Sequence, residues 1–235
     1  MSLSKLLAKE ENMVANSGIV SFDLWMTLLK SGGHSFKTAR NLLLRDTMAS
    51  SMEAGEFDAM VRAVDRQADR IAEQRGTDVQ FEERVNMVAK AAKRPALDAA
   101  SLEAFYTTQS SMFAASPPVL LDPNTPAILD GLSVGRDLAV ISNTGFIKGR
   151  EMRRALDQLG ILGSFKYLIF SNEVGYAKPS PRIFRALLDE VGVEPQSVTH
   201  VGDNPVADIA GAGAIGMRTV HMAPGATLSE IIEEI

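Results

Sequence analysis

Short apolar runs that end in small or polar residues recur along the chain. They lie at residues 18–23, 138–142, 167–170, 198–203 and 217–221. Each run is almost continuously apolar and rich in β-branched residues, which is typical of strands buried on both faces of a sheet. The pattern therefore predicts strands in the interior of a parallel sheet.

Segments with helical spacing separate the last four runs. Apolar residues recur at i, i+3, i+4 and i+7 over residues 152–159, and a second such stripe covers 183–191. Gly160 stands where a helix commonly ends, and Thr227 to Glu230 has the capping-box pattern that opens a short terminal helix. Alternating strands and helices predict an α/β fold, a doubly wound parallel sheet with helices on both faces.

The stretch from Gly33 to Ser116 carries no strand pattern. Its apolar residues form helical stripes over 36–47, 57–71, 81–92 and 102–113. We therefore predict a small helical domain, residues 33–116, inserted into a core formed by residues 1–32 and 117–235. Pro117 and Pro118 mark one edge of the insertion, and Gly32 and Gly33 mark the other. A loose helix is expected over roughly the first 15 residues.

Composition and charge narrow the class of protein. Apolar residues make up 46% of the 235 residues and charged residues 23%, which excludes wholesale disorder. A net charge of −5 argues against nucleic-acid binding through phosphate neutralisation. The chain has no cysteine, so thiolate metal sites and cysteine nucleophiles are excluded. No apolar run approaches the roughly 20 residues that cross a bilayer, and Glu10 and Glu11 argue against a signal peptide. We expect a cytoplasmic protein, and its oligomeric state is not readable from the sequence.

Chemically capable side chains stand where the predicted strands end. Ligands bind outside the carboxyl ends of the strands in an open parallel sheet. The residues at that edge are Asp23, Ser142, Asn143, Lys178, Asp203 and Asp208. A carboxylate can attack phosphorus, a second one can help to hold Mg²⁺, and hydroxyl, amide and ammonium groups can bind the negative charge of a transferring phosphoryl group. This set predicts phosphoryl transfer.

Four segments around these residues resemble the motifs of the haloacid dehalogenase-like hydrolase superfamily, in the same order. They are residues 20–28 (VSFDLWMTL), 140–143 (VISN), 178–184 (KPSPRIF) and 201–212 (VGDNPVADIAGA). The helical insertion matches the subgroup whose cap domain enters between the first two motifs. The resemblance implies a Rossmann-like catalytic core and a cap that closes over the site and selects a small phosphorylated substrate.

The resemblance also implies a role for each acid and for the lysine. Asp23 would be the nucleophile. Asp203 would bind Mg²⁺ together with Asp23 and the backbone carbonyl of Trp25. Lys178 would neutralise negative charge, and Asp208 would orient Lys178 or contribute to the metal site through a bound water.

The remaining matched positions imply contacts with the substrate. Ser142 and the backbone amide of Asn143 would hold the transferring group. Trp25 and Thr27, in the first motif, are further candidates for substrate contact.

Position 25 departs from the phosphatase pattern. The phosphatases of this superfamily carry there a second Asp that protonates the leaving group, whereas an indole N–H donates a hydrogen bond and is no acid or base near neutral pH. The 2-haloacid dehalogenases have an aromatic residue at this position, but they use no metal, lack the counterpart of Asp203 and take the halide with an early arginine, for which Arg40 and Arg45 are the nearest candidates.

Three functions follow from these observations. We predict a Mg²⁺-dependent phosphatase that forms an aspartyl-phosphate on Asp23. A 2-haloacid dehalogenase is the alternative within enzymology, and a phosphate-binding module with weak or no turnover is the alternative outside it.

Overall fold

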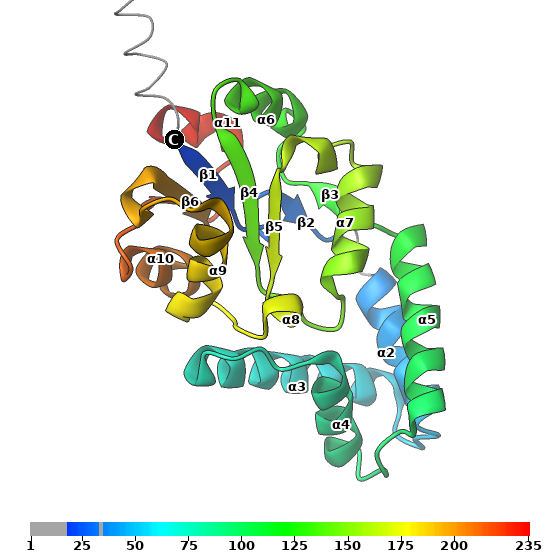
Figure 1. The fold of residues 1–235 in the computed structure, drawn as a ribbon. Coiled ribbons are helices and arrows are strands. Elements are labelled where there is room, and N and C mark those ends of the chain that lie inside the picture. The colour runs from blue at the N-terminus through cyan, green and yellow to red at the C-terminus, as the bar shows by residue number, and fades with distance from the viewer. Residues whose placement is uncertain (1–17, 33–34) are drawn as a thin grey trace, which may run out of the picture.

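A five-stranded parallel sheet forms the centre of the computed structural model, which describes residues 18–32 and 35–235 (Figure 1). The sheet has the order β5-β4-β1-β6-β7. Its strands are β1 (Ile19–Phe22), β4 (Asp137–Ser142), β5 (Tyr167–Phe170), β6 (Val198–Gly202) and β7 (Arg218–His221). The five apolar runs of the sequence are therefore confirmed as parallel strands. The expected N-terminal helix and Gly33 lie outside the described residues.

Helices cover both faces of this sheet because successive strand residues point to opposite sides. On one face, Phe22 and Val140 pack with Leu156 of α7, and on the other Ile141 packs with Ile183 of α9. The first face is covered by α6 (Thr125–Ser133), α7 (Gly149–Gln158) and α11 (Leu228–Ile231), and the second by α9 (Pro181–Val191) and α10 (Gly211–Gly213). This is the doubly wound α/β architecture that the sequence predicted.

Four helices between β2 and β3 form a cluster with an apolar core of its own. They are α2 (Ser35–Thr47), α3 (Ala54–Arg75), α4 (Phe81–Ala91) and α5 (Ala99–Ala115), which we call the helical insertion. Phe57, Val85 and Phe105 are buried in this core. Figure 1 shows α3 running past the end of the sheet toward which the strand arrows point. The division of the chain into two domains at residues 33 and 116 stays a prediction.

A two-stranded antiparallel sheet joins the insertion to the rest of the chain. In it β2 (Leu29–Lys30) pairs with β3 (Val119–Leu120). Strands of two residues are too short to show an alternating pattern, so the sequence did not predict them. The pairing brings the two ends of the insertion together.

The remaining elements are short. They are α8 (Ser171–Val174), 3₁₀ turns at Leu162–Ser164, Pro195–Ser197 and Ile232–Glu234, and a π-helical segment at Pro205–Ala210. The predicted capping box between Thr227 and Glu230 is confirmed at the start of α11. Among the helices that the structure describes, none is both long enough and apolar enough to span a membrane.

Candidate active site

Asp23 lies immediately after β1, at the carboxyl end of the central strand. Its backbone N–H donates to the carbonyl of Val201 at 2.9 Å, which continues the sheet by one residue, and the residue as a whole is only 7% exposed. The chain then turns back sharply, because the Leu24 carbonyl accepts from the N–H groups of Leu28 and Leu29. Met26 occupies this turn with φ 62°, a conformation that favours glycine.

Lys178 is the hub of the site. Its ammonium donates to Asp23 Oδ1 at 2.7 Å, to Asp208 Oδ1 at 2.6 Å and to the carbonyl of Ile141 at 2.9 Å. Burial by itself would lower the pKa of Lys178, but the two carboxylates outweigh it and the pKa is raised. Lys178 is therefore a permanent cation that fixes the orientation of Asp23.

A buried histidine, which the sequence pattern did not mark as a site residue, supports this ion cluster. His200 of β6 is fully buried between the Ser21 hydroxyl at 2.9 Å from Nδ1 and Asp208 Oδ1 at 3.2 Å from Nε2. Burial lowers the pKa of His200, so the ring is neutral. Since a carboxylate only accepts, Nε2 donates to Asp208 and Nδ1 accepts from Ser21.

Both carboxylate oxygens of Asp208 accept hydrogen bonds. Besides Lys178 and His200 on Oδ1, its Oδ2 accepts from the backbone N–H of Asn204 at 3.0 Å. Burial would raise the pKa of Asp208, but Lys178 and His200 hold it well below the usual range. Gly202 is required beside it, because a Cβ at that position would collide with the Asp208 carboxylate. Asp208 is thus a structural anion that holds Lys178.

Asp203 adds a third carboxylate to the cluster. Carboxylate oxygens of Asp23, Asp203 and Asp208 lie within 4.8 Å of one another. Burial raises the pKa of Asp23 to about 6, and burial followed by the charge of Asp208 raises the pKa of Asp203. Neighbouring carboxyl groups disfavour each other's ionised form, and a cation bound between them stabilises that form.

The donor set suits a hard divalent cation such as Mg²⁺. The donor atoms of this set are carboxylate oxygens. Among the described residues, no side chain donates a hydrogen bond to the Asp203 carboxylate, whereas the Asp208 carboxylate already accepts from Lys178, His200 and Asn204. Asp23 and Asp203 are therefore the residues best placed to bind a metal directly.

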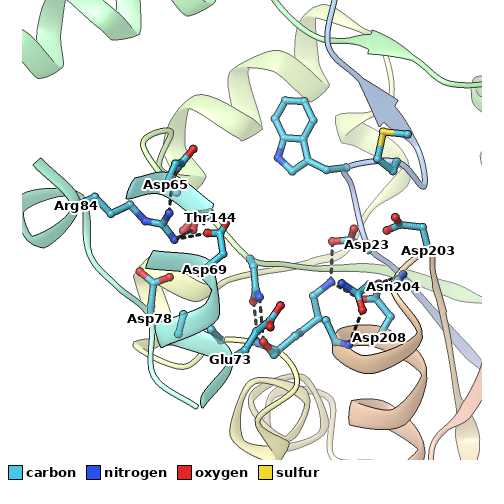
Figure 2. Close-up of a pocket in the computed structure, with 18 residues that line it drawn as sticks. Asp23, Asp65, Asp69, Glu73, Asp78, Arg84, Thr144, Asp203, Asn204 and Asp208 are labelled. Carbon is cyan, nitrogen blue, oxygen red and sulfur yellow. Dashed lines mark hydrogen bonds and ion pairs between the residues drawn. The ribbon is translucent and has the colours of Figure 1, made fainter. Parts of the chain in front are cut away.

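The cluster opens into a cavity of about 340 Å³ between the sheet and the helical insertion (Figure 2). Asp65 and Asp69 of α3 line its far wall, where the buried guanidinium of Arg84 contacts them at 2.7 and 2.8 Å. Figure 2 shows Asp23 and Asp203 on the opposite side of the cavity. Burial raises the pKa of Asp69 although Arg84 opposes the shift.

The sequence pattern by itself does not predict this acidic wall. The spacing of Asp65, Asp69 and Glu73 at i, i+4 and i+8 on one helix is visible in the sequence, and all three line the cavity. Without the fold, nothing distinguished this face of α3 from an ordinary solvated face.

The predicted substrate contacts divide into two groups. Trp25 and Asn143 line the cavity together with the acids and Lys178. Asn143 also bonds the backbone of Lys178 through both its amide oxygen, at 2.8 Å, and its amide nitrogen, at 3.1 Å. Ser142 and Thr27 are both about 1% exposed and are not among the residues that line the cavity. Their predicted roles in holding the substrate stay predictions.

Comparisons with known proteins agree with this geometry. A family model described as haloacid dehalogenase-like hydrolase matches residues 19–216. The chain belongs to this family. All four motifs that carry the resemblance lie within the residues that the family model matches.

Two curated relatives and one solved structure illustrate the likeness. A mouse haloacid dehalogenase-like hydrolase domain-containing protein 3 is 36% identical over 100 residues, which cover 43% of this chain and 38% of that protein. A glyceraldehyde 3-phosphate phosphatase of Methanopyrus kandleri is 31% identical over 131 residues, 56% of this chain and 53% of that protein. The chain therefore spans about half or less of the length of these relatives.

The solved structure extends the likeness over nearly the whole fold. A haloacid dehalogenase-like (HAD) hydrolase of Bacillus subtilis, bound to magnesium, superposes with a TM-score of 0.68 over 93% of this chain and 98% of that one. Its sequence identity is 19%, so this likeness concerns the fold.

Proposed function

We propose that this hydrolase is a Mg²⁺-dependent phosphatase that transfers the phosphoryl group of a small phosphate monoester to Asp23. The observation that carries the proposal is the contact of Lys178 with both Asp23 and Asp208, beside the third carboxylate of Asp203. The name of the Methanopyrus relative, a phosphatase of a phosphorylated three-carbon sugar, supports the same class of substrate.

The chain's own residues account for the first step. A carboxylate oxygen of Asp23 attacks phosphorus, and the bond from phosphorus to the ester oxygen breaks with its electron pair on the leaving group. Lys178 keeps Asp23 oriented and offsets the charge that builds up next to it. Water then attacks phosphorus in the aspartyl-phosphate and releases inorganic phosphate, which restores the Asp23 carboxylate.

Asp23 and Asp203 would hold Mg²⁺, with the backbone carbonyl of Trp25 as a further ligand. The metal would supply positive charge against the phosphate oxygens and keep both carboxylates ionised. Asp208 is committed to Lys178 and would act on the metal only through a bound water.

The chemistry at position 25 limits the leaving group. The Trp25 indole has no titratable proton near neutral pH, so it does not protonate the departing oxygen. Loss of such general acid help typically costs about 10²–10⁴-fold in rate. We therefore propose a preference for esters whose leaving group departs as a stable anion.

The test combines turnover with detection of the covalent intermediate. Purified protein is assayed with 4-nitrophenyl phosphate in Mg²⁺ and in EDTA, and acid-quenched samples are examined for phosphate bound to protein. We expect Mg²⁺-dependent turnover and labelling at Asp23, both abolished in Asp23→Asn. Asp130→Asn, a change at an exposed acid on α6, is the matched control and should behave like the wild type.

The same assay separates the alternatives. Chloride release from 2-chloropropionate without metal would identify a dehalogenase instead. Saturable binding of inorganic phosphate without turnover of any ester would identify a binding module.

Mg²⁺ should also raise the melting temperature of the wild type and not that of Asp203→Asn, because only a protein that binds the ion in its folded state is stabilised by it.

A further inference from the structure

A second cavity lies next to the catalytic one and shares a wall with it. Its volume is about 160 Å³, and Trp25, Asp65 and Gly145 line both cavities. An apolar cavity of about 150 Å³ is known to hold one benzene molecule. The second cavity is therefore large enough for a single six-membered ring attached to a group in the catalytic cavity.

Four aromatic side chains line this second cavity. Phe36 and Phe113 meet edge to face with ring centroids 5.2 Å apart, and Phe146 and Trp25 are the other two aromatic residues of the lining. Phe146 is held in place because its carbonyl accepts from the Gln109 amide at 2.7 Å. A flat apolar group suits such a wall better than a hydrated polyol, since each ring offers a face or an edge for stacking.

A buried cation lies in the same wall. Arg40 is 4% exposed, its guanidinium lies 4.2 Å from the centroid of the Phe146 ring, and its Nε and Nη2 donate to the neutral amide oxygen of Asn41. No carboxylate of a described residue forms an ion pair with it. The two acids whose negative charges act on Arg40 are Asp58 and Asp65, and each is paired with another arginine. Asp58 pairs with Arg62 and Asp65 pairs with Arg84, both at 2.7 Å.

Burial of a charged guanidinium is unfavourable in free energy unless an anion pairs with it. Burial without a direct counter-ion disfavours the charged form of an arginine, and a carboxylate in the cavity supplies the missing partner in the two-point geometry that guanidinium groups bind best. Lys37, which also lines this cavity and is exposed, adds a second positive charge at its rim. The net charge of the cavity therefore favours an anionic ligand, unlike the acidic wall of the catalytic cavity.

From these contacts we infer that the second cavity is a leaving-group site for a planar organic carboxylate, so that the substrate is an aryl phosphate that carries a carboxylate on its ring. This assignment rests on the proposed phosphatase function and names its substrate class. It agrees with Trp25 in place of an acid, because a phenolate departs without protonation far more readily than an alkoxide.

Turnover of three matched esters tests the assignment. The substrates are 4-carboxyphenyl phosphate, 4-carbamoylphenyl phosphate and phenyl phosphate. The neutral amide withdraws electrons more strongly than the carboxylate, so leaving-group ability alone favours the amide. We expect kcat/KM for the carboxylate to exceed that for the amide by at least tenfold, and a preference for the amide overturns the assignment.

Two arginine variants on the same helix localise the effect. Arg40→Met should reduce kcat/KM for 4-carboxyphenyl phosphate by tenfold or more and change that for phenyl phosphate by less than threefold. Arg45→Met is the matched control, because Arg45 lies on α2 outside both cavities and pairs with Asp46. An equal loss for all three substrates in Arg40→Met, or the same loss in Arg45→Met, contradicts the assignment.

A binding measurement keeps the inference independent of turnover and of any folding defect in Arg40→Met. Trp25 is the single tryptophan of the chain, and it lines the cavity, so its emission reports on entry of a ligand. Benzoate should change the emission of the wild type saturably, and benzamide should not. Saturation by benzoate in a protein that hydrolyses no phosphate ester would refute the phosphatase and retain the carboxylate site. Phosphatase activity with no response to benzoate, and no preference for the carboxylate ester, would refute the carboxylate site and retain the phosphatase.

Discussion

At the scale of single residues, the site is organised by one buried lysine. Lys178 contacts Asp23 and Asp208, and His200 holds Asp208 from the other side. Asp23 carries a raised pKa because of its burial, so it depends on the charge of Lys178 and of any bound cation for its ionised form. Trp25 is the residue at this scale that sets the site apart from the phosphatase motif.

Replacement of Trp25 by Asp tests whether the missing acid limits the enzyme. In Trp25→Asp we expect hydrolysis of alkyl phosphates, such as glycerol phosphate, to rise by about tenfold or more, because a carboxyl group can then protonate the alkoxide. The measurement is kcat/KM for an alkyl and an aryl phosphate in both proteins.

Trp25→Asn is the control for this change, because it also opens the cavity and supplies no acid. If the rate for alkyl phosphates improves as much in Trp25→Asn, or improves in neither variant, the absence of the acid is not what limits the enzyme.

At the scale of elements, hydrogen bonds between distant segments fix the ends of short helices. Asp122, before α6, accepts from the N–H of Asn124 at 2.8 Å and from the N–H and hydroxyl of Ser229 at 2.9 and 2.5 Å. Ser229 belongs to α11 and lies 107 positions after Asp122 in the sequence. The Asp122 carboxylate therefore joins α11 to the start of α6. Burial would raise the pKa of Asp122, but the hydrogen bonds from Ser229 and Asn124 lower it.

The stability contributed by Asp122 should depend on pH. A lowered pKa in the folded state means that the stabilisation is complete above the pKa of the unfolded chain and is lost as the pH falls through the folded value. We expect Asp122→Asn to reduce the free energy of unfolding by about 2 kcal/mol at pH 7 and by clearly less near pH 3. Urea denaturation at both pH values measures the difference.

The exposed acid Asp130 provides the control on the same helix. Asp130→Asn should leave the free energy of unfolding almost unchanged at both pH values. A destabilisation by Asp122→Asn that is the same at pH 7 and pH 3 would show that the charge of Asp122 is not what joins the helices.

At the scale of the whole molecule, the helical insertion is held against the sheet by buried polar contacts. Arg84 of α4 is 1% exposed and contacts Asp65 and Asp69 of α3, and its Nη2 also donates to the carbonyl of Thr144 after β4 at 3.4 Å. Ser171 of α8 donates to Asp78 at 2.8 Å. These contacts place the acidic wall opposite Asp23.

Removal of Arg84 should destabilise the protein and disturb the site together. We expect Arg84→Leu to lower the free energy of unfolding by about 3 kcal/mol, because it leaves Asp65 without its partner inside the cavity wall. It should also lower kcat/KM, since the loop at Thr144 borders the catalytic cavity. Denaturation and turnover of 4-nitrophenyl phosphate measure the two effects.

Arg75→Leu is the matched control for this change. Arg75 forms an exposed ion pair with Glu83 at 3.2 Å, and exposed pairs contribute about 0–1 kcal/mol. Equal effects of the two arginine changes would mean that the contacts of Arg84 do not hold the insertion in place.

The sequence by itself determined the α/β class, the parallel strands and the order of the motifs that carry Asp23, Lys178 and Asp203. The physical reason is that strand and helix periods, caps and strand-end residues are local features. It did not reveal His200 as a partner of Asp208, because a histidine within an apolar strand pattern looks like any buried residue.

Only the tertiary structure decided what surrounds these residues. It placed the acidic face of α3 opposite Asp23, paired the two-residue strands β2 and β3, and left Arg40 buried beside aromatic rings with no ion pair to a carboxylate of the described residues. Each of these features depends on which side chains from distant segments meet, and on how much water they exclude. Neither quantity is set by the neighbours of a residue along the chain.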